Sequence, residues 1–226
     1  MKTLRNMVMI TIALVVFHTT SWAINNPADM TSSYGQIPME FYKICSDAGG
    51  SHWFDVSFPV NEKKDANIYF DNWVSKSGED KALGVITSKS FSNRFQLTFS
   101  HYSFWGESGS SATQDLWVDK GWENGGFNIL LPLQPGGDPT YGVRQKVDKT
   151  HFFLQYAKST EDFNYGVSFE IKGGISLDLA YQENSENKYL RISKLIHAKS
   201  GIFIPEIRVK ANDTGYIGFG LGFVPN

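Results

Sequence analysis

The chain has 226 residues and a mass of 25.4 kDa, and 41% of its residues are hydrophobic, which is enough apolar material for one large domain or two small ones. A formal net charge of −2 excludes a dominant basic surface, so we expect no nucleic-acid partner. The single cysteine, Cys45, excludes an internal disulfide, and we expect it to be a small buried residue rather than a reactive thiol.

Residues 1–23 have the pattern of a signal peptide. Two basic residues precede an apolar run over residues 7–17, and Ser21 and Ala23 supply the small side chains of a cleavage site. The run is shorter than the roughly 20 residues of a transmembrane helix. Its removal leaves 19 basic and 23 acidic residues, a formal net charge of −4. We therefore predict bacterial export, with a mature protein of residues 24–226 in the periplasm, at the cell surface or outside the cell.

The first half of the mature chain contains short segments typical of strands, separated by glycine, serine and proline. Residues 106–113 and 134–141 have loop composition. Neither a repeat nor a low-complexity tract is present, so a single all-β domain over residues 24–226 is predicted. The candidate strands cover residues 52–60, 66–74, 83–90, 94–105, 127–133 and 151–157.

The segment from Phe95 to Trp122 is rich in aromatic residues and encloses the glycine- and serine-rich stretch 106–113. Flat rings beside amide and carboxylate groups suit stacking on sugars, although most of these rings could equally belong to a core. The hypothesis is a binding surface for a glycan or a surface protein. Its candidate ligand-binding residues are Tyr102, Trp105, Trp117, Trp122 and Asn124.

The last third of the chain alternates polar and apolar residues with period two. Residues 163–171 place five apolar side chains on one face, and Gly173-Gly174 then predicts a tight hairpin turn. Further strands are expected over residues 175–182, 188–199, 202–210 and 216–223. The predicted fold is therefore an all-β, antiparallel sandwich or barrel with a C-terminal meander.

Two architectures fit this alternation, since the apolar face can point into a soluble core or towards lipid. In the soluble alternative Phe219, Leu221 and Phe223 lie in the core. In a membrane barrel the opposite face would line a narrow lumen in which charged residues pair. These residues are Glu170, Asp178, Arg191 and Arg208.

The closing stretch 216–223, YIGFGLGF, resembles the final strand of outer-membrane barrels. Such barrels usually end on an aromatic residue, whereas this chain continues through Val224-Pro225-Asn226. Lys194 argues against contact with lipid, because it shares a face with apolar residues in the middle of a predicted strand. A lysine side chain that faces hydrocarbon there would cost about 2–4 kcal/mol. Pro205 also interrupts the next strand. The balance therefore favours the soluble alternative.

Motifs that carry enzymatic chemistry are missing from the sequence: it has no phosphate-binding loop, no nucleophile elbow, no HExxH and no CxxC. The histidines of the mature chain are isolated, so neither a metal nor a cofactor is expected. Glu170 and Asp178 flank one hairpin and could form the carboxylate pair of a glycosidase, but a solvated polar face explains them as well. These histidines are His52, His101, His151 and His197.

The sequence thus favours a non-enzymatic, exported β-domain of a bacterial envelope that binds a glycan or a protein and whose open sheet edges permit strand addition. An outer-membrane β-barrel serving as a small channel or anchor is the main alternative. A secreted carbohydrate-active hydrolase is the third.

Overall fold

The computed structural model describes residues 40–47, 50–91, 94–107, 109–184, 186–211 and 215–226; the predicted signal peptide lies outside this part of the chain. Strands make up 76% of the structure, which confirms the predicted all-β class, and none of the described residues forms a helix that could cross a membrane. The strands are β1 (Phe41–Asp47), β2 (His52–Pro59), β3 (Ala66–Val74), β4 (Lys81–Phe91), β5 (Phe95–Gly106), β6 (Gly109–Trp122), β7 (Gly125–Pro132), β8 (Thr140–Val147), β9 (Thr150–Ala157), β10 (Asp162–Ile171), β11 (Ile175–Gln182), β12 (Asn187–Lys194), β13 (Ile196–Ala198), β14 (Gly201–Ala211) and β15 (Tyr216–Pro225).

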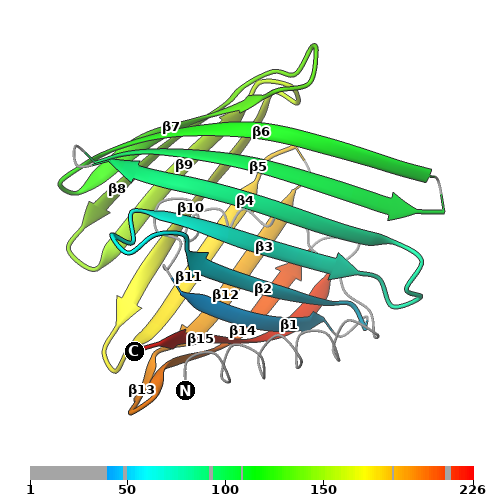
Figure 1. Cartoon of the computed structure of the whole chain (residues 1–226). Coiled ribbons are helices and arrows are strands. Elements are labelled where there is room, and N and C mark those ends of the chain that lie inside the picture. The colour runs from blue at the N-terminus through cyan, green and yellow to red at the C-terminus, as the bar shows by residue number, and fades with distance from the viewer. Residues whose placement is uncertain (1–39, 48–49, 92–93, 108, 185, 212–214) are drawn as a thin grey trace.

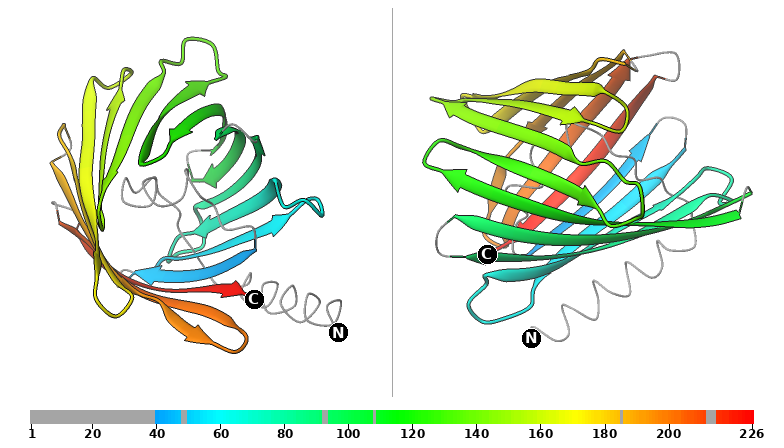
Figure 2. Two further views of the ribbon diagram at one scale, coloured as in Figure 1. Left: turned by 90° about the vertical axis from the view of Figure 1, so that its left-hand side faces the viewer. Right: turned by 90° about the horizontal axis from the view of Figure 1, so that it is seen from above.

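The sheet closes on itself. From β1 to β12 each strand pairs antiparallel with the next; β12 then pairs with β14, β14 with β15, and β15 with β1. The result is a 14-strand antiparallel barrel, so of the two predicted architectures the barrel is confirmed and the sandwich is wrong. Figure 2 shows the sheet curving round until β1 and β15 lie side by side, which brings the two ends of the described chain together.

Pro205 explains why the predicted strand over residues 188–199 is divided. The ladder between β12 and β14 ends at Ser193↔Glu206, and that between β13 and β14 begins at Ile196↔Phe203. Pro205 lies in this gap, where its missing N–H removes a ladder hydrogen bond. Lys194 is the last residue of β12 rather than a mid-strand residue, so the objection that its charge would face the centre of a bilayer is removed.

The two faces of the barrel differ sharply in chemistry. Because cross-strand partners share a face, the registers divide the strand residues into an outward and an inward set. The outward set is mostly apolar: Phe219 is 57% and Leu221 51% exposed, so the prediction that they lie in a core is wrong. Other exposed outward residues are Ile44, Phe99, Phe127, Val143, Leu154, Phe169, Leu179, Ile192, Ile207 and Ile217.

The inward set is largely polar and buried. Because the sheet is closed, the side chains opposite the exposed apolar ones meet in the interior. This barrel therefore has the opposite polarity to a soluble β-domain, whose apolar side chains lie inside. Buried inward polar residues are Lys43, Asp55, Ser57, Asn67, Thr98, Ser100, Asp119, Gln155, Asp162, Asn164, Asp178, Asn187, Glu206 and Arg208.

The barrel has a termini end, where β1 begins and β15 stops, and a far end. The termini end has the tight connections at residues 123–124, 148–149 and 172–174; in the last of these Gly173 and Gly174 adopt positive φ, as the hairpin prediction required. The far end has the longest connection, residues 133–139. From β6 to β12 tight turns thus alternate with longer connections, whereas residues 60–65 at the termini end form a long connection and residues 107–108 at the far end a tight one.

Three strands were not predicted from the sequence: β1, β6 and β8. The stretch 106–113, predicted as a loop, is mostly strand, because Gly109 begins β6 and pairs with Gly106 at the end of β5. Its small polar residues carry no apolar alternation from which a strand could be predicted. The β5–β6 hairpin consequently projects at the far end, past the point where β7 stops, as Figure 1 shows.

Candidate functional site: the charged interior wall

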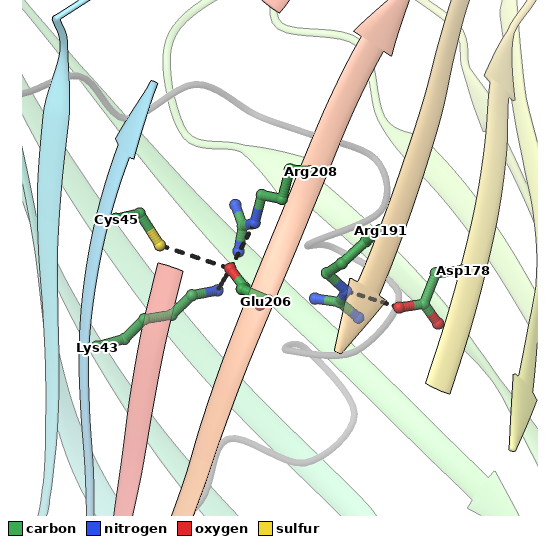
Figure 3. A network of polar contacts seen from close by, with 6 residues as sticks. All are labelled: Lys43, Cys45, Asp178, Arg191, Glu206 and Arg208. Carbon is green, nitrogen blue, oxygen red and sulfur yellow. Dashed lines mark hydrogen bonds and ion pairs between the residues drawn. The ribbon is translucent and has the colours of Figure 1, made fainter. Parts of the chain in front are cut away.

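The clearest cluster of charged groups lies on the interior wall where the barrel closes. Glu206 on β14 is at its centre: its Oε1 accepts hydrogen bonds from Arg208 Nε at 2.6 Å and lies 3.0 Å from Lys43 Nζ on β1. The Cys45 thiol, 1% exposed, lies 3.5 Å from the same oxygen. Figure 3 shows these side chains converging from β1 and β14, and they connect the first strand to the C-terminal hairpin.

Glycine makes this contact possible. β15 runs between β1 and β14, and Gly220 pairs with Cys45 on one side and with Glu206 on the other. A Cβ atom on Gly220 would lie 2.6 Å from Glu206 Oε1 and 2.7 Å from the Cys45 sulfur, closer than ordinary van der Waals contact. Only a residue without a side chain lets the β1 groups reach β14 over the strand between them.

A second ion pair continues the cluster along the wall. Arg191 on β12 donates from Nε to Asp178 on β11 at 2.6 Å, and Figure 3 shows this pair beside Glu206. The Arg208 guanidinium also lies over the Trp53 ring, 5.6 Å from its centroid, a cation–π contact across the closure. The sequence predicts that Asp178, Arg191 and Arg208 pair in the lumen of a membrane barrel, and the structure confirms that they face inward and take part in ion pairs.

Two further inward contacts use the same arrangement of a long side chain passing over a glycine. Arg144 on β8 reaches Asp119 on β6, with Nη2 2.8 Å from Oδ1, and a Cβ on the intervening Gly126 would lie 2.6 Å from Nη2. Tyr102 on β5 lies over Gly84 of β4 and donates to Asp71 of β3 at 3.2 Å. Each contact links strands that are not neighbours in the sheet and so stiffens the wall.

The cluster consists of buried charges that are paired with one another. Buried charges are tolerated only when they are paired and hydrogen-bonded, and removing one partner of such a pair typically costs about 3–5 kcal/mol. Histidine is absent from the cluster, and no group of metal-ligating side chains occurs among the residues that the structure describes. Cys45 is buried as predicted, but its neighbours are charged rather than apolar.

Ion pairs at the two ends of the barrel are exposed and weaker. At the termini end, hydrogen bonds from Lys89 and Asn61 lower the pKa of Asp65. At the far end, the Asp138 carboxylate accepts a hydrogen bond from Lys158 at 2.8 Å and raises the pKa of that lysine. Solvent screens both pairs, so they contribute little to stability.

The five predicted ligand-binding residues do not form one surface. Trp105 and Trp122 are exposed and point outward, but they lie at opposite ends of the barrel. Trp105 pairs with Ser110 near the tip of the β5–β6 hairpin, whereas Trp122 ends β6, roughly 40 Å away along the strand. Trp117 is buried and faces inward. Tyr102 also faces inward and is half-buried. Asn124 lies in the β6–β7 turn, where its carbonyl accepts a hydrogen bond from the Lys146 amide. Ligand binding by these residues stays a prediction.

The predicted carboxylate pair is divided between two sets of partners. Asp178 is held by Arg191, whereas Glu170 lies 3.6 Å from Lys146 and 3.5 Å from His151 near the termini end. Sequence reasoning missed Lys43, Glu206 and Gly220 as members of the interior cluster. The signal that could have found them is the alternation of glycine with large apolar residues in β15, which leaves one face of that strand bare.

Comparison with known proteins adds little. No family model matches the sequence, and no curated protein matches it. A solved structure described as "Crystal structure of Usher PapC translocation pore" is similar over 84% of this chain, with 8% sequence identity and a TM-score of 0.30, and the matched part spans 59% of that chain. A similarity this weak carries no argument about function.

Proposed function

We propose that the protein is an integral β-barrel of the bacterial outer membrane. The observation that carries the proposal is the inverted polarity of the barrel, with exposed apolar side chains outside and buried charged ones inside. In water such an exterior is unfavourable, because soluble proteins rarely expose large contiguous apolar patches. In a bilayer the same exterior meets hydrocarbon, and the closed ring of strands satisfies the backbone hydrogen bonds that lipid cannot.

Aromatic residues near both ends support this placement. Outward Trp and Tyr side chains typically lie at the level of the lipid headgroups, where one part of the ring is apolar and the other is hydrated. Outward aromatic residues close to the far end include Tyr141 and Tyr156; close to the termini end, Trp122 and Phe152 hold comparable positions. Trp122, one of the tryptophans that suggested sugar stacking, is therefore also explained as a membrane anchor.

The connections support an orientation. Outer-membrane barrels keep short turns and both termini on the periplasmic side and longer loops outside. Between β6 and β9 the termini end has the tight turns at residues 123–124 and 148–149 and the far end has the longer connection at residues 133–139, although connections 60–65 and 107–108 do not follow this pattern. We therefore assign the termini end to the periplasm, consistent with the signal peptide predicted for residues 1–23.

The activity that the polar interior supports best is a small channel for ions or polar solutes. The second candidate, a membrane anchor that does not conduct, is favoured by the burial of the interior cluster, since the side chains of Asp178, Glu206 and Arg208 are only 6%, 4% and 3% exposed. Charged groups that line a wide aqueous channel would be more accessible than this.

Expression with the native signal sequence, followed by fractionation, tests the membrane assignment. We expect a protein that needs detergent for extraction and whose electrophoretic mobility changes on heating, because a folded barrel resists unfolding in unheated sample buffer. Release with the soluble periplasmic contents would refute it. Reconstitution in planar bilayers then separates the two activities: stepwise conductance supports the channel, and a heat-modifiable protein without conductance supports the anchor.

A further inference from the structure

One part of the sheet has an unpaired edge. The ladder between β6 and β7 ends at Asp115↔Pro132, whereas β6 continues to Gly109 and pairs there only with β5. Residues 109–113 therefore form a free edge, roughly 17 Å long at about 3.3 Å per residue, on the projecting β5–β6 hairpin (Figure 1). Among the described residues, none pairs with this side of the segment.

The direction of the backbone groups is fixed by one hydrogen bond. The amide of Leu133 donates to the carbonyl of Gln114 at 2.8 Å, so the backbone of Gln114 points to the β7 side. Backbone groups alternate along a strand, and those of Ala112 and Ser110 point to the same side. The N–H and C=O groups of Ser110 and Ala112 therefore point to the free side of the hairpin in the geometry that pairing with another strand requires.

The side chains of this edge do nothing to block pairing. Natural edge strands are usually protected by lysine, proline, a bulge or a covering loop. Here the sequence from Gly109 to Thr113 is Gly-Ser-Ser-Ala-Thr, all exposed, with neither charge nor proline. Ser110 and Ala112 are small, and they share the outward face with Trp105, which pairs with Ser110 and is 45% exposed. A side chain on an added strand can therefore pass over Ser110 to the indole ring.

We infer that the free edge of residues 109–113 is a docking site for an extended segment of a partner protein, which adds a strand beside β6. The charge at this end indicates the kind of segment. The described connections of the far end hold seven carboxylates and two lysines, of which Lys158 is paired with Asp138. The carboxylates are those of Glu79, Asp80, Glu107, Asp138, Glu161, Glu183 and Glu186.

A segment with basic residues at its ends is attracted to this surface, and long-range attraction also speeds docking. A second copy of the chain would bring the same carboxylates and be repelled. The partner is therefore an extended segment that carries lysine or arginine. The inference rests on the proposed function in one respect, because the far end must lie outside the bilayer.

The test uses the full barrel held in nanodiscs, after its change of mobility on heating has been verified. The probe is a fluorescent eight-residue peptide of alternating threonine and valine with a lysine at each end, and anisotropy measures its affinity. The comparison peptides are one that is N-methylated at alternate residues, which removes N–H donors, and one with glutamate at each end. We expect each comparison peptide to bind at least about tenfold more weakly.

Two variants at one position test the edge itself. Ala112→Pro removes an N–H that points away from β5, so the hairpin ladder is retained, and proline is tolerated on edge strands in this orientation. Ala112→Thr keeps the N–H and is the matched control. The inference predicts at least about tenfold weaker peptide binding for Ala112→Pro and unchanged binding for Ala112→Thr.

Equal affinity for the methylated and unmethylated peptides overturns the inference, and so does unchanged binding by the proline variant. A dimer in solution that Ala112→Pro dissociates would assign the edge to a second copy and overturn it as well. A protein that shows no heat-modifiable form refutes the proposed membrane barrel instead, so the two failures are distinguishable.

Discussion

Replacing Gly220 by alanine should destabilise the barrel by disrupting the closure between β1 and β14. The new Cβ would lie 2.6 Å from Glu206 Oε1 and 2.7 Å from the Cys45 sulfur, where ordinary contacts begin at 3.4 Å. The Glu206 carboxylate must therefore move by roughly 0.8 Å. It is held at 2.6 Å by Arg208 and at 3.0 Å by Lys43, so this movement lengthens or breaks at least one charged contact.

The expected cost is about 3 kcal/mol, the lower end of the penalty for leaving a buried charge without its partner. Gly222→Ala is the matched control, because Gly222 shares the strand and the inward face of Gly220. A Cβ there would meet only the edge of the Phe41 ring at 3.1 Å and Ile204 at 3.3 Å, and the loss should stay below about 1 kcal/mol.

Urea unfolding of the barrel in lipid vesicles, followed by tryptophan fluorescence, measures both losses in free energy. The double variant Gly220→Ala/Cys45→Ala should recover part of the loss, because it removes the contact with sulfur. If Gly220→Ala and Gly222→Ala unfold at the same urea concentration, the ion pairs across β15 do not need a glycine at position 220.

Three further predictions follow from the faces and ends of the barrel. Phe219→Ala should lower the free energy of unfolding by less than the roughly 3–5 kcal/mol that the same change costs in a protein core. Phe219→Lys should cost about 2–4 kcal/mol if the side chain lies near the bilayer midplane. Unfolding from lipid vesicles measures both. Trp105→Ala and Trp122→Ala should each leave the heat-modifiable form intact, because neither ring is buried; loss of that form would place them in a core. In Lys89→Met the pKa of Asp65 should rise towards its ordinary value in a nuclear magnetic resonance titration. Since the ion pair lowers that pKa, the stabilisation that the pair gives is present at neutral pH and is lost on acidification. An unchanged pKa of Asp65 would contradict the pairing.

Local structure could be predicted well where polar and apolar residues alternate. The strand predicted over residues 163–171 matches β10, and the turn predicted at Gly173-Gly174 has the positive φ values that glycine permits. Where alternation is weak, prediction failed: β6 begins with Gly-Ser-Ser-Ala-Thr, a composition typical of loops. This segment is a strand because β5 pairs with it, and that pairing is not encoded in its own side chains.

Which face points inward could not be predicted, because period two is the same for a soluble core and for a lipid-facing wall. The difference arises from long-range pairing: β1 must meet β15 before Lys43 and Glu206 can lie on a common interior surface. Lys194 and Pro205 could not be placed correctly from the sequence, because their positions relative to the end of β12 depend on the register with β14. The candidate site was therefore found only in part, through Asp178, Arg191 and Arg208.

The central claim, that the apolar face contacts lipid, is tested most directly by spin labels on adjacent residues of β10. With Cys45 replaced by alanine, single cysteines at Phe169, which points outward, and Ser168, which points inward, carry a nitroxide in bilayers. We expect the label at position 169 to collide with oxygen, which dissolves in lipid, and to be shielded from a water-soluble nickel complex. The label at position 168 should show no such preference for oxygen. A label at position 169 that is more accessible to the nickel complex than to oxygen would contradict contact between the apolar face and lipid.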